Sequence, residues 1–166
     1  GTGAHQLSHD GQDAENPTQT ADGRYIVYSS GNLAKNGIWR MRADGSEPTR
    51  LVPGTFFLPD VSPDGRYVAY ALTNTAEDRN ELYVAEVESG REVFHTWLPP
   101  SGYQAVVQPG RPRWMPDGRS LVFVSLDARR GGILCAQEFR PGENTDATRR
   151  DLVTLGGEAE VESFGV

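Results

Sequence analysis

Residues 59–70 read Pro-Asp-Val-Ser-Pro-Asp-Gly-Arg-Tyr-Val-Ala-Tyr, and this stretch decides the fold. Its Pro-Asp-Gly triplet, residues 63–65, is typical of a tight turn. Proline presets φ at the first corner, aspartate favours the second, and glycine accepts the positive φ of the bulge that closes a hairpin. The run after the triplet is continuously apolar, whereas a half-exposed strand would alternate apolar and polar residues. The stretch therefore predicts a β-hairpin covered on both faces.

The same pattern occurs twice more in the chain. Residues 17–28 read Pro-Thr-Gln-Thr-Ala-Asp-Gly-Arg-Tyr-Ile-Val-Tyr, and residues 112–123 read Pro-Arg-Trp-Met-Pro-Asp-Gly-Arg-Ser-Leu-Val-Phe. The turn glycines are 42 and 53 residues apart. This spacing fits the period of about 40–50 residues of propeller blades, with an insertion in the second interval. The predicted structural turns are Asp22-Gly23, Asp64-Gly65 and Asp117-Gly118.

Each repeat unit is predicted to contain four strands joined by short turns. The first strand precedes the Pro-Asp-Gly turn and the second follows it. The expected second, third and fourth strands are 25–28, 38–42 and 49–52 in the first unit, 67–71, 82–87 and 92–96 in the second, and 121–124, 133–137 and 151–154 in the third. Repeated four-stranded antiparallel sheets with two apolar faces predict an all-β fold, a β-propeller of about three blades.

Composition agrees with this prediction and narrows the class of partner. The 166 residues suffice for one domain, and 19 glycines with 11 prolines exclude a helical bundle. No apolar run approaches the ~20 residues of a membrane span, so we expect no membrane insertion. The net charge of −7 argues against nucleic acid as a partner.

The repeats also resemble those of the TolB-type propeller family, whose units carry a Ser-Pro-Asp-Gly turn. The match is close at Pro59 to Gly65, at Ile38 to Met41 and at Asp44 to Ser46, whereas Thr20-Ala21 and Met115 depart from the pattern. The resemblance covers residues 5–166 and implies half of a six-bladed propeller. The expected organisation is a single propeller segment, 1–166, with blades at about 14–52, 55–96 and 107–154 and strand fragments of neighbouring blades at 5–8 and 161–166.

The sequence offers no pattern typical of an enzyme. It lacks a Gly-x-Ser-x-Gly nucleophile elbow, and His5, His9 and His95 have no evident catalytic partner. The acidic stretch 10–16 lacks the spacing of a calcium loop, and Cys135 lies in an apolar run typical of a buried strand. We therefore predict a non-enzymatic protein with no cofactor and no metal.

The best candidates for binding residues lie in the loops of one propeller rim. The connection 97–103 carries two aromatic residues, and it shares this rim with the loops between second and third strands. Aromatic and arginine side chains are enriched at binding hot spots. The competing interpretation is that the tryptophan caps a blade edge and the arginines are only solvated. The candidates are Trp97, Tyr103, Arg79, Arg129 and Arg130.

The resemblance implies a protein-interaction platform with a protein or peptide partner. Two alternatives stay open, because similar propellers restrict substrate access in prolyl-oligopeptidase-type serine hydrolases and form the sensor portions of receptor kinases. A periplasmic or extracellular location is implied by the resemblance alone.

The apolar strands further predict that the two terminal blades expose apolar faces. Such faces are unusual in a soluble monomer. Two copies would join into a ring of six blades, so we expect a homodimer. The competing expectation is a monomer whose end segments fold back over these faces.

Overall fold

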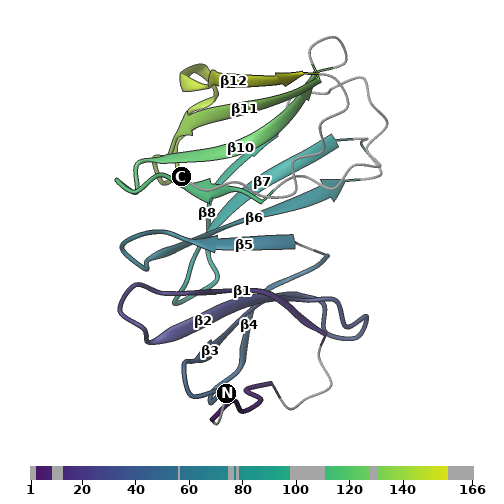
Figure 1. Ribbon diagram of the computed structural model, residues 1–166, viewed down its shortest axis with the longest axis vertical. Coiled ribbons are helices and arrows are strands. Elements are labelled where there is room, and N and C mark those ends of the chain that lie inside the picture. The colour runs from purple at the N-terminus through teal and green to yellow at the C-terminus, as the bar shows by residue number, and fades with distance from the viewer. Residues whose placement is uncertain are drawn as a thin grey trace.

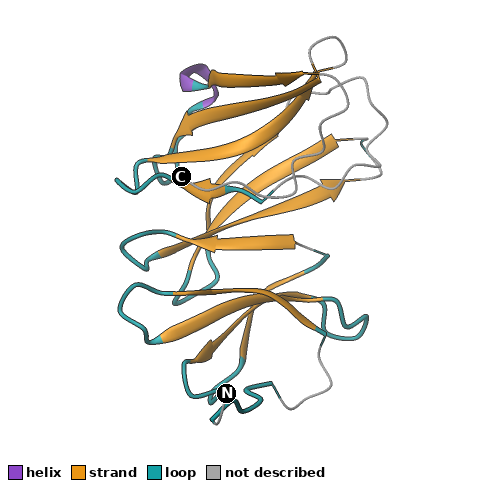
Figure 2. Cartoon of the chain, in the orientation of Figure 1, coloured by secondary structure: helices purple, strands orange, loops and turns teal. Residues whose placement is uncertain are grey.

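The computed structural model describes residues 3–8, 13–55, 57–74, 77, 79–97, 111–127 and 131–156. These residues form three four-stranded antiparallel sheets, or blades, stacked along the long axis of the molecule (Figure 1). The described part of the chain is built of strands and loops apart from one short 3-10 helix, η1 (Asp146–Thr148) (Figure 2). The predicted all-β propeller fold of about three blades is therefore confirmed.

Within each blade the strands follow one another in space as they do in the sequence. Blade 1 consists of β1 (Ala14–Gln19), β2 (Tyr25–Ser30), β3 (Gly37–Arg42) and β4 (Thr49–Pro53). Blade 2 consists of β5 (Phe57–Val61), β6 (Tyr67–Asn74), β7 (Arg79–Glu86) and β8 (Glu92–Trp97). Blade 3 consists of β9 (Arg113–Trp114), β10 (Ser120–Asp127), β11 (Gly131–Glu138) and β12 (Arg150–Gly156).

The turn between β5 and β6 is held by a small set of local hydrogen bonds. Gly65 has a φ of 73°, and its N–H donates to the Ser62 carbonyl at 2.8 Å. The Ser62 hydroxyl donates to Asp64 Oδ1 at 2.6 Å and accepts the Tyr67 N–H at 3.0 Å. Asp64 Oδ1 also accepts the N–H of Arg66 at 3.0 Å. The serine hydroxyl thus joins the start of β6 to the aspartate of the turn.

The two departures from the repeat pattern differ in what they preserve. In blade 1 the Thr20 hydroxyl donates to Asp22 Oδ1 at 2.6 Å and accepts the Tyr25 N–H at 3.0 Å, so threonine replaces serine without loss. In blade 3 Met115 has no hydroxyl, and its turn keeps the backbone bond from Gly118 N–H to the Met115 carbonyl and the bond from Arg119 N–H to Asp117 Oδ1, both at 2.9 Å. The turn therefore does not require the hydroxyl.

The turn predicts a clear effect of a side chain at Gly65. A Cβ there would meet only ordinary van der Waals contacts with Thr20, so the cost of Gly65→Val comes from the left-handed φ alone. We expect a loss of about 1–3 kcal/mol in the free energy of unfolding, measured by urea denaturation. Gly65→Asn is the control, since asparagine tolerates this conformation better, and it should cost less. Equal stability of the valine variant and the wild type would contradict this account of the turn.

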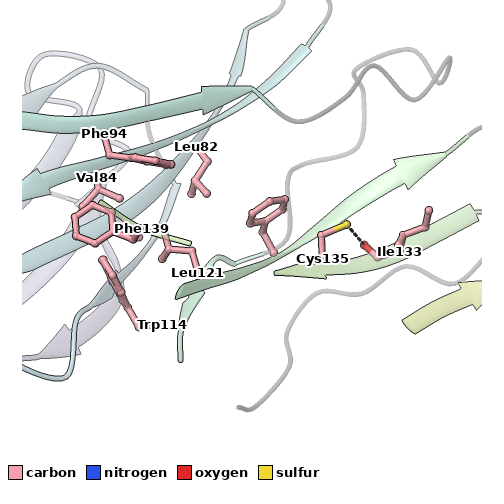
Figure 3. Packing of buried hydrophobic residues seen from close by; sticks show 10 residues of the cluster. Leu82, Val84, Phe94, Trp114, Leu121, Ile133, Cys135 and Phe139 are labelled. Atoms are coloured by element: carbon pink, nitrogen blue, oxygen red, sulfur yellow. Dashed lines mark hydrogen bonds between the residues drawn. The ribbon is translucent and has the colours of Figure 1, made fainter. Parts of the chain in front are cut away.

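Apolar clusters join the blades to one another. Blades 1 and 2 share a cluster that includes Val27 and Ile38 from one side and Val68 and Tyr70 from the other. Blades 2 and 3 share a second cluster, part of which Figure 3 shows around Phe139. The second cluster contains Ala69, Leu82, Val84, Phe94, Trp114, Leu121, Phe123, Ile133, Cys135 and Phe139. Cys135, the single cysteine of the chain, is a buried thiol in this cluster, as its apolar surroundings in the sequence indicate.

The outer faces of the terminal blades differ from the expectation of exposed apolar surface. On blade 1, Tyr28, Trp39 and Met41 are buried, and Leu7 packs against them. On blade 3, Val122 and Val124 lie on the face of β10 opposite Leu121 and Phe123, because successive side chains alternate, and they are buried as well. The described large apolar residues that are exposed are Leu33, Trp97, Leu152 and Val153.

The segment before blade 1 also differs from its prediction. Residues 5–8 were expected to form a strand of a neighbouring blade, but residues 4–8 have no regular secondary structure. Leu7 nevertheless lies beside the β3–β4 turn, close to Gly45. Leu7 therefore lies next to blade 1, as an outer strand would, but its segment does not form a strand. The expected fragment at 161–166 lies outside the described residues.

Candidate functional site

The candidate site lies at the rim where β6 ends, β7 begins and β8 ends (Figure 1). Arg79 is the first residue of β7, and Trp97 is the last residue of β8. The β7–β8 register pairs Trp97 with Glu81, which is two residues from Arg79 and on the same face. Antiparallel pairing thus brings Arg79 and Trp97 together. The other three candidates, Tyr103, Arg129 and Arg130, lie outside the described residues.

The guanidinium of Arg79 stacks over the indole of Trp97. Its Cζ lies 4.6 Å from the centroid of the Trp97 ring, a cation–π contact. Trp97 remains 54% exposed, whereas the Arg79 side chain is mostly covered. The pair therefore presents an aromatic surface whose orientation is set by its neighbour.

A buried carboxylate holds this arginine in place. Glu81 Oε1 lies 2.5 Å from Arg79 Nε, and the Glu81 side chain is only 3% exposed. Asn74 Nδ2 donates to the same oxygen at 3.3 Å, and the Tyr83 hydroxyl donates to Glu81 Oε2. Glu77, an exposed residue, adds a second ion pair to Arg79 at 2.6 Å. The orientation of Arg79 is therefore fixed by two carboxylates, the buried Glu81 in β7 and the exposed Glu77 in the loop before it.

Hydrogen bonds keep Glu81 charged despite its burial. Burial alone would raise the pKa of Glu81, but the bonds from Tyr83, Arg79 and Asn74 outweigh it and hold the pKa below its ordinary value. Burial and the bond to Glu81 raise the pKa of the Tyr83 phenol, so Tyr83 stays a donor. The bond to Glu81 likewise raises the pKa of Arg79. The cluster is thus a fixed, charged pair at neutral pH.

His95 lies next to an acidic residue, Glu81, and the sequence alone did not show this pairing. Its Nε2 lies 3.6 Å from Glu81 Oε2, and its ring stacks on Tyr83 at 4.3 Å between centroids. Tyr83 stacks in turn on Tyr70 at 5.7 Å. Tyr83 and His95 thus lie at Glu81 Oε2, whereas Arg79 binds Oε1.

The residues that the sequence analysis missed follow a simple pattern. Glu81, Tyr83 and His95 join the predicted pair, and the two from β7 are at positions i+2 and i+4 from Arg79. Alternation along a strand places such residues on one face. The available signal was a glutamate directly before the run Leu82-Tyr83-Val84-Ala85 of the predicted strand. Its partner on β8 could not be assigned without the strand register.

A second polar cluster joins the inner strands of blades 2 and 3. Asp60 Oδ2 accepts the Trp114 N–H at 2.9 Å, and the Asp60 carbonyl accepts the indole N–H of Trp114 at 3.0 Å. Arg113 Nη1 lies 3.4 Å from Asp60 Oδ1. Burial raises the pKa of Asp60 above its ordinary value although Trp114 and Arg113 oppose it. This cluster is enclosed and connects blades, so it is a structural junction.

Two kinds of feature are absent from the described residues. No group of three or more His, Cys, Asp or Glu side chains is placed to hold a metal ion in that part of the chain. No helix there is long and apolar enough to cross a membrane.

Comparison with known proteins identifies the fold family. No family model matches the chain. The Tol-Pal system protein TolB of Francisella tularensis subsp. tularensis is 28% identical over 160 aligned residues, covering 72% of this chain and 37% of that protein. The crystal structure of TolB from Acinetobacter baumannii superimposes with a TM-score of 0.65 at 16% identity, covering 90% of this chain and 34% of that one. The chain has the TolB-like β-propeller fold. It spans about a third of the length of these relatives.

The TolB-like fold is shared with proteins of other kinds. An uncharacterized peptidase, y4sO, of Sinorhizobium fredii is 31% identical over 117 residues, covering 64% of this chain and 15% of that protein. A prolyl endopeptidase structure superimposes with a TM-score of 0.58 at 15% identity, covering 84% of this chain and 22% of that one. At this identity the structural likeness concerns the fold alone.

The buried carboxylate predicts a pH-dependent contribution to stability. Because the folded-state pKa of Glu81 lies below its ordinary value of 4.5, its charged form stabilises the fold above that pH, and this stabilisation is lost as the pH falls through the folded-state pKa. Glu81→Gln should lower the free energy of unfolding by about 1–3 kcal/mol at pH 7. Denaturation at several pH values should show the difference from wild type narrowing below about pH 4.

Glu77→Gln is the matched control for this experiment. It removes a carboxylate from the same arginine at an exposed position, where an ion pair contributes little. Its effect should be smaller than that of Glu81→Gln at pH 7. A Glu81→Gln difference that stays constant between pH 7 and pH 3 would contradict the assignment of a charged, stabilising Glu81.

Proposed function

We propose that this chain is a non-enzymatic protein-interaction platform that contacts its partner through the rim site of Arg79 and Trp97. The observation that carries the proposal is that Trp97 is 54% exposed, yet its indole stacks on the Arg79 guanidinium, which the buried Glu81 carboxylate binds. Tryptophan and arginine are enriched at interface hot spots. A side chain oriented before binding loses less conformational freedom on association. The rim site is therefore suited to a protein or peptide partner.

The relatives suggest where to look for this partner. Several curated relatives are named as TolB proteins of the Tol-Pal system. We therefore propose a protein of a Tol-Pal system as the partner to be tested first, and a periplasmic or extracellular location by the same resemblance. No nucleic-acid role is proposed, since the net charge of −7 would repel a polyanion.

Binding measurements on two variants test the rim site. Trp97→Ala should weaken the affinity for a purified Tol or Pal protein by roughly 30-fold, the loss typical of a hot-spot residue, measured by isothermal titration calorimetry. Glu143→Ala is the control, because Glu143 is exposed in the connection that follows β11, at the opposite ends of the strands from Trp97, and it should leave the affinity unchanged. Equal affinity of the Trp97→Ala variant and the wild type would reject the rim site. Absence of binding to all of these proteins would reject the Tol-Pal assignment.

A second candidate function is the substrate-gating propeller of a prolyl-oligopeptidase-type serine hydrolase. The likeness to peptidase y4sO and to a prolyl endopeptidase favours it. In that role the propeller would restrict access to a catalytic domain, and the rim would face substrate or that domain.

Both candidate functions predict that this chain by itself does not hydrolyse esters or peptides, since a gating propeller leaves chemistry to another domain. Incubation with chromogenic ester and peptide substrates should give no turnover above buffer. Turnover that disappears on replacement of one serine would contradict the non-enzymatic assignment.

A further inference from the structure

The contacts between successive blades repeat at their outer strands. Each outer strand contains a β-bulge, where the register with the third strand shifts by one residue. A bulge leaves one residue outside the ladder. The bulged residues are Leu51 in β4, Val93 in β8 and Leu152 in β12.

In two of the three blades, a glycine turn of the next blade lies on the bulge. Gly90, in the β7–β8 turn with φ 70°, approaches the Leu51 carbonyl so closely that a Cβ would overlap it. Gly142, with φ 78°, donates its N–H to the Val93 carbonyl at 2.7 Å. Both contacts place a turn glycine of one blade beside the bulge carbonyl of the blade before it. They differ in kind, because a Cβ at Gly90 would overlap the Leu51 carbonyl, whereas Gly142 donates a hydrogen bond and a Cβ there would meet nothing within 4 Å.

The residue after each bulge packs against the same neighbouring blade. Val52 belongs to the cluster that contains Val87, and the Phe94 ring lies edge-on to Phe139 with centroids 5.6 Å apart. Val87 and Phe139 come directly after the third strands of the next blades. Each junction thus combines a backbone contact at the bulge with an apolar contact beside it.

In blade 3 the bulged residue and the residue after it are Leu152 and Val153, and both are exposed. Leu152 is 46% exposed and Val153 is 48% exposed. The equivalent residues in β4 and β8 are partly or fully buried. The contact at Leu51 shows what fits here, namely a hairpin turn with a glycine at positive φ.

Blade 1 carries such a turn at its β3–β4 connection. Gly45 has a φ of 87°, and a Cβ there would lie 2.9 Å from the carbonyl oxygen of Leu7. Leu7 therefore occupies, against blade 1, the position that Leu51 occupies against blade 2. Residues 4–8 are not paired in a strand, whereas β12 is already hydrogen-bonded to β11. A preformed strand loses less conformational freedom on docking than an unpaired segment does.

We propose that Leu152 and Val153 of β12 form a docking site for the Gly45 turn of a second copy of this chain, in exchange for that copy's own Leu7. The surface is distinct from the Arg79–Trp97 site, so the two proposals fail independently. The contact joins different surfaces of the two copies, so it is heterologous and either closes into a ring or continues. Two copies of three blades each would make the six-bladed ring that the sequence predicts.

Light scattering coupled to size-exclusion chromatography tests the proposal on the full chain. The wild-type mass should rise from the 18.2 kDa of one chain toward twice that value with concentration. Leu7→Ala weakens the competing contact within one copy, so association should begin at a concentration about tenfold lower. Val153→Arg should return the mass to one chain, because it places a charge in the docking site.

The double variant and a control decide which surface is used. Leu7→Ala combined with Val153→Arg should be monomeric, whereas Leu33→Arg, at another exposed leucine, should associate like the wild type. Masses beyond two chains that fall in the double variant would support the docking site with an open arrangement. A mass of one chain for both wild type and Leu7→Ala at all concentrations would overturn the proposal and leave a turn of another protein as occupant. Association that persists in the double variant would place the contact elsewhere.

Discussion

Each blade of this protein must cover two apolar sheet faces, and the rest of the architecture depends on that constraint. The second strands are buried on both sides, with Val27, Val68 and Val122 almost fully inaccessible. A single four-stranded sheet could not bury such a strand by itself, because each face needs a partner layer. Stacking satisfies the inner faces, and the outer face of blade 1 receives Leu7 instead. The repeat is therefore stable only as a stack.

The same constraint explains where polar groups are found. Between the blades, polar side chains occur where they complete hydrogen bonds, as at Asp60 and Trp114. Toward the rim, β7 and β8 pair as far as the ends of the blade, so their faces change from core to surface. Glu81 lies at this boundary, buried but reached by Arg79, Tyr83 and Asn74. At this boundary Glu81 fixes the orientation of Arg79, and Arg79 stacks on the indole of the exposed Trp97.

The blade junctions use backbone geometry more than side-chain identity. Each outer strand has a bulge, and in blades 1 and 2 a glycine turn from the next blade approaches the carbonyl of the bulged residue. The first of these junctions needs a glycine, because a Cβ at Gly90 would overlap the Leu51 carbonyl, whereas a Cβ at Gly142 would meet nothing within 4 Å. The two junctions tolerate different residues at the bulge, which are leucine in blade 1 and valine in blade 2. Such junctions can therefore repeat while the sequence of the blades varies.

The sequence by itself determined the repeat, its turns and the class of fold, because Pro-Asp-Gly and the continuous apolar strands act locally. The sequence also predicted that Arg79 and Trp97 lie on the same rim, because short turns join neighbouring strands in antiparallel order. It did not show that Glu81 and His95 meet, nor that residues 5–8 lie beside Gly45 without forming a strand. Those features depend on strand register and on which layer covers each face. Both are set by packing between segments distant in the chain, and only the tertiary structure decides them.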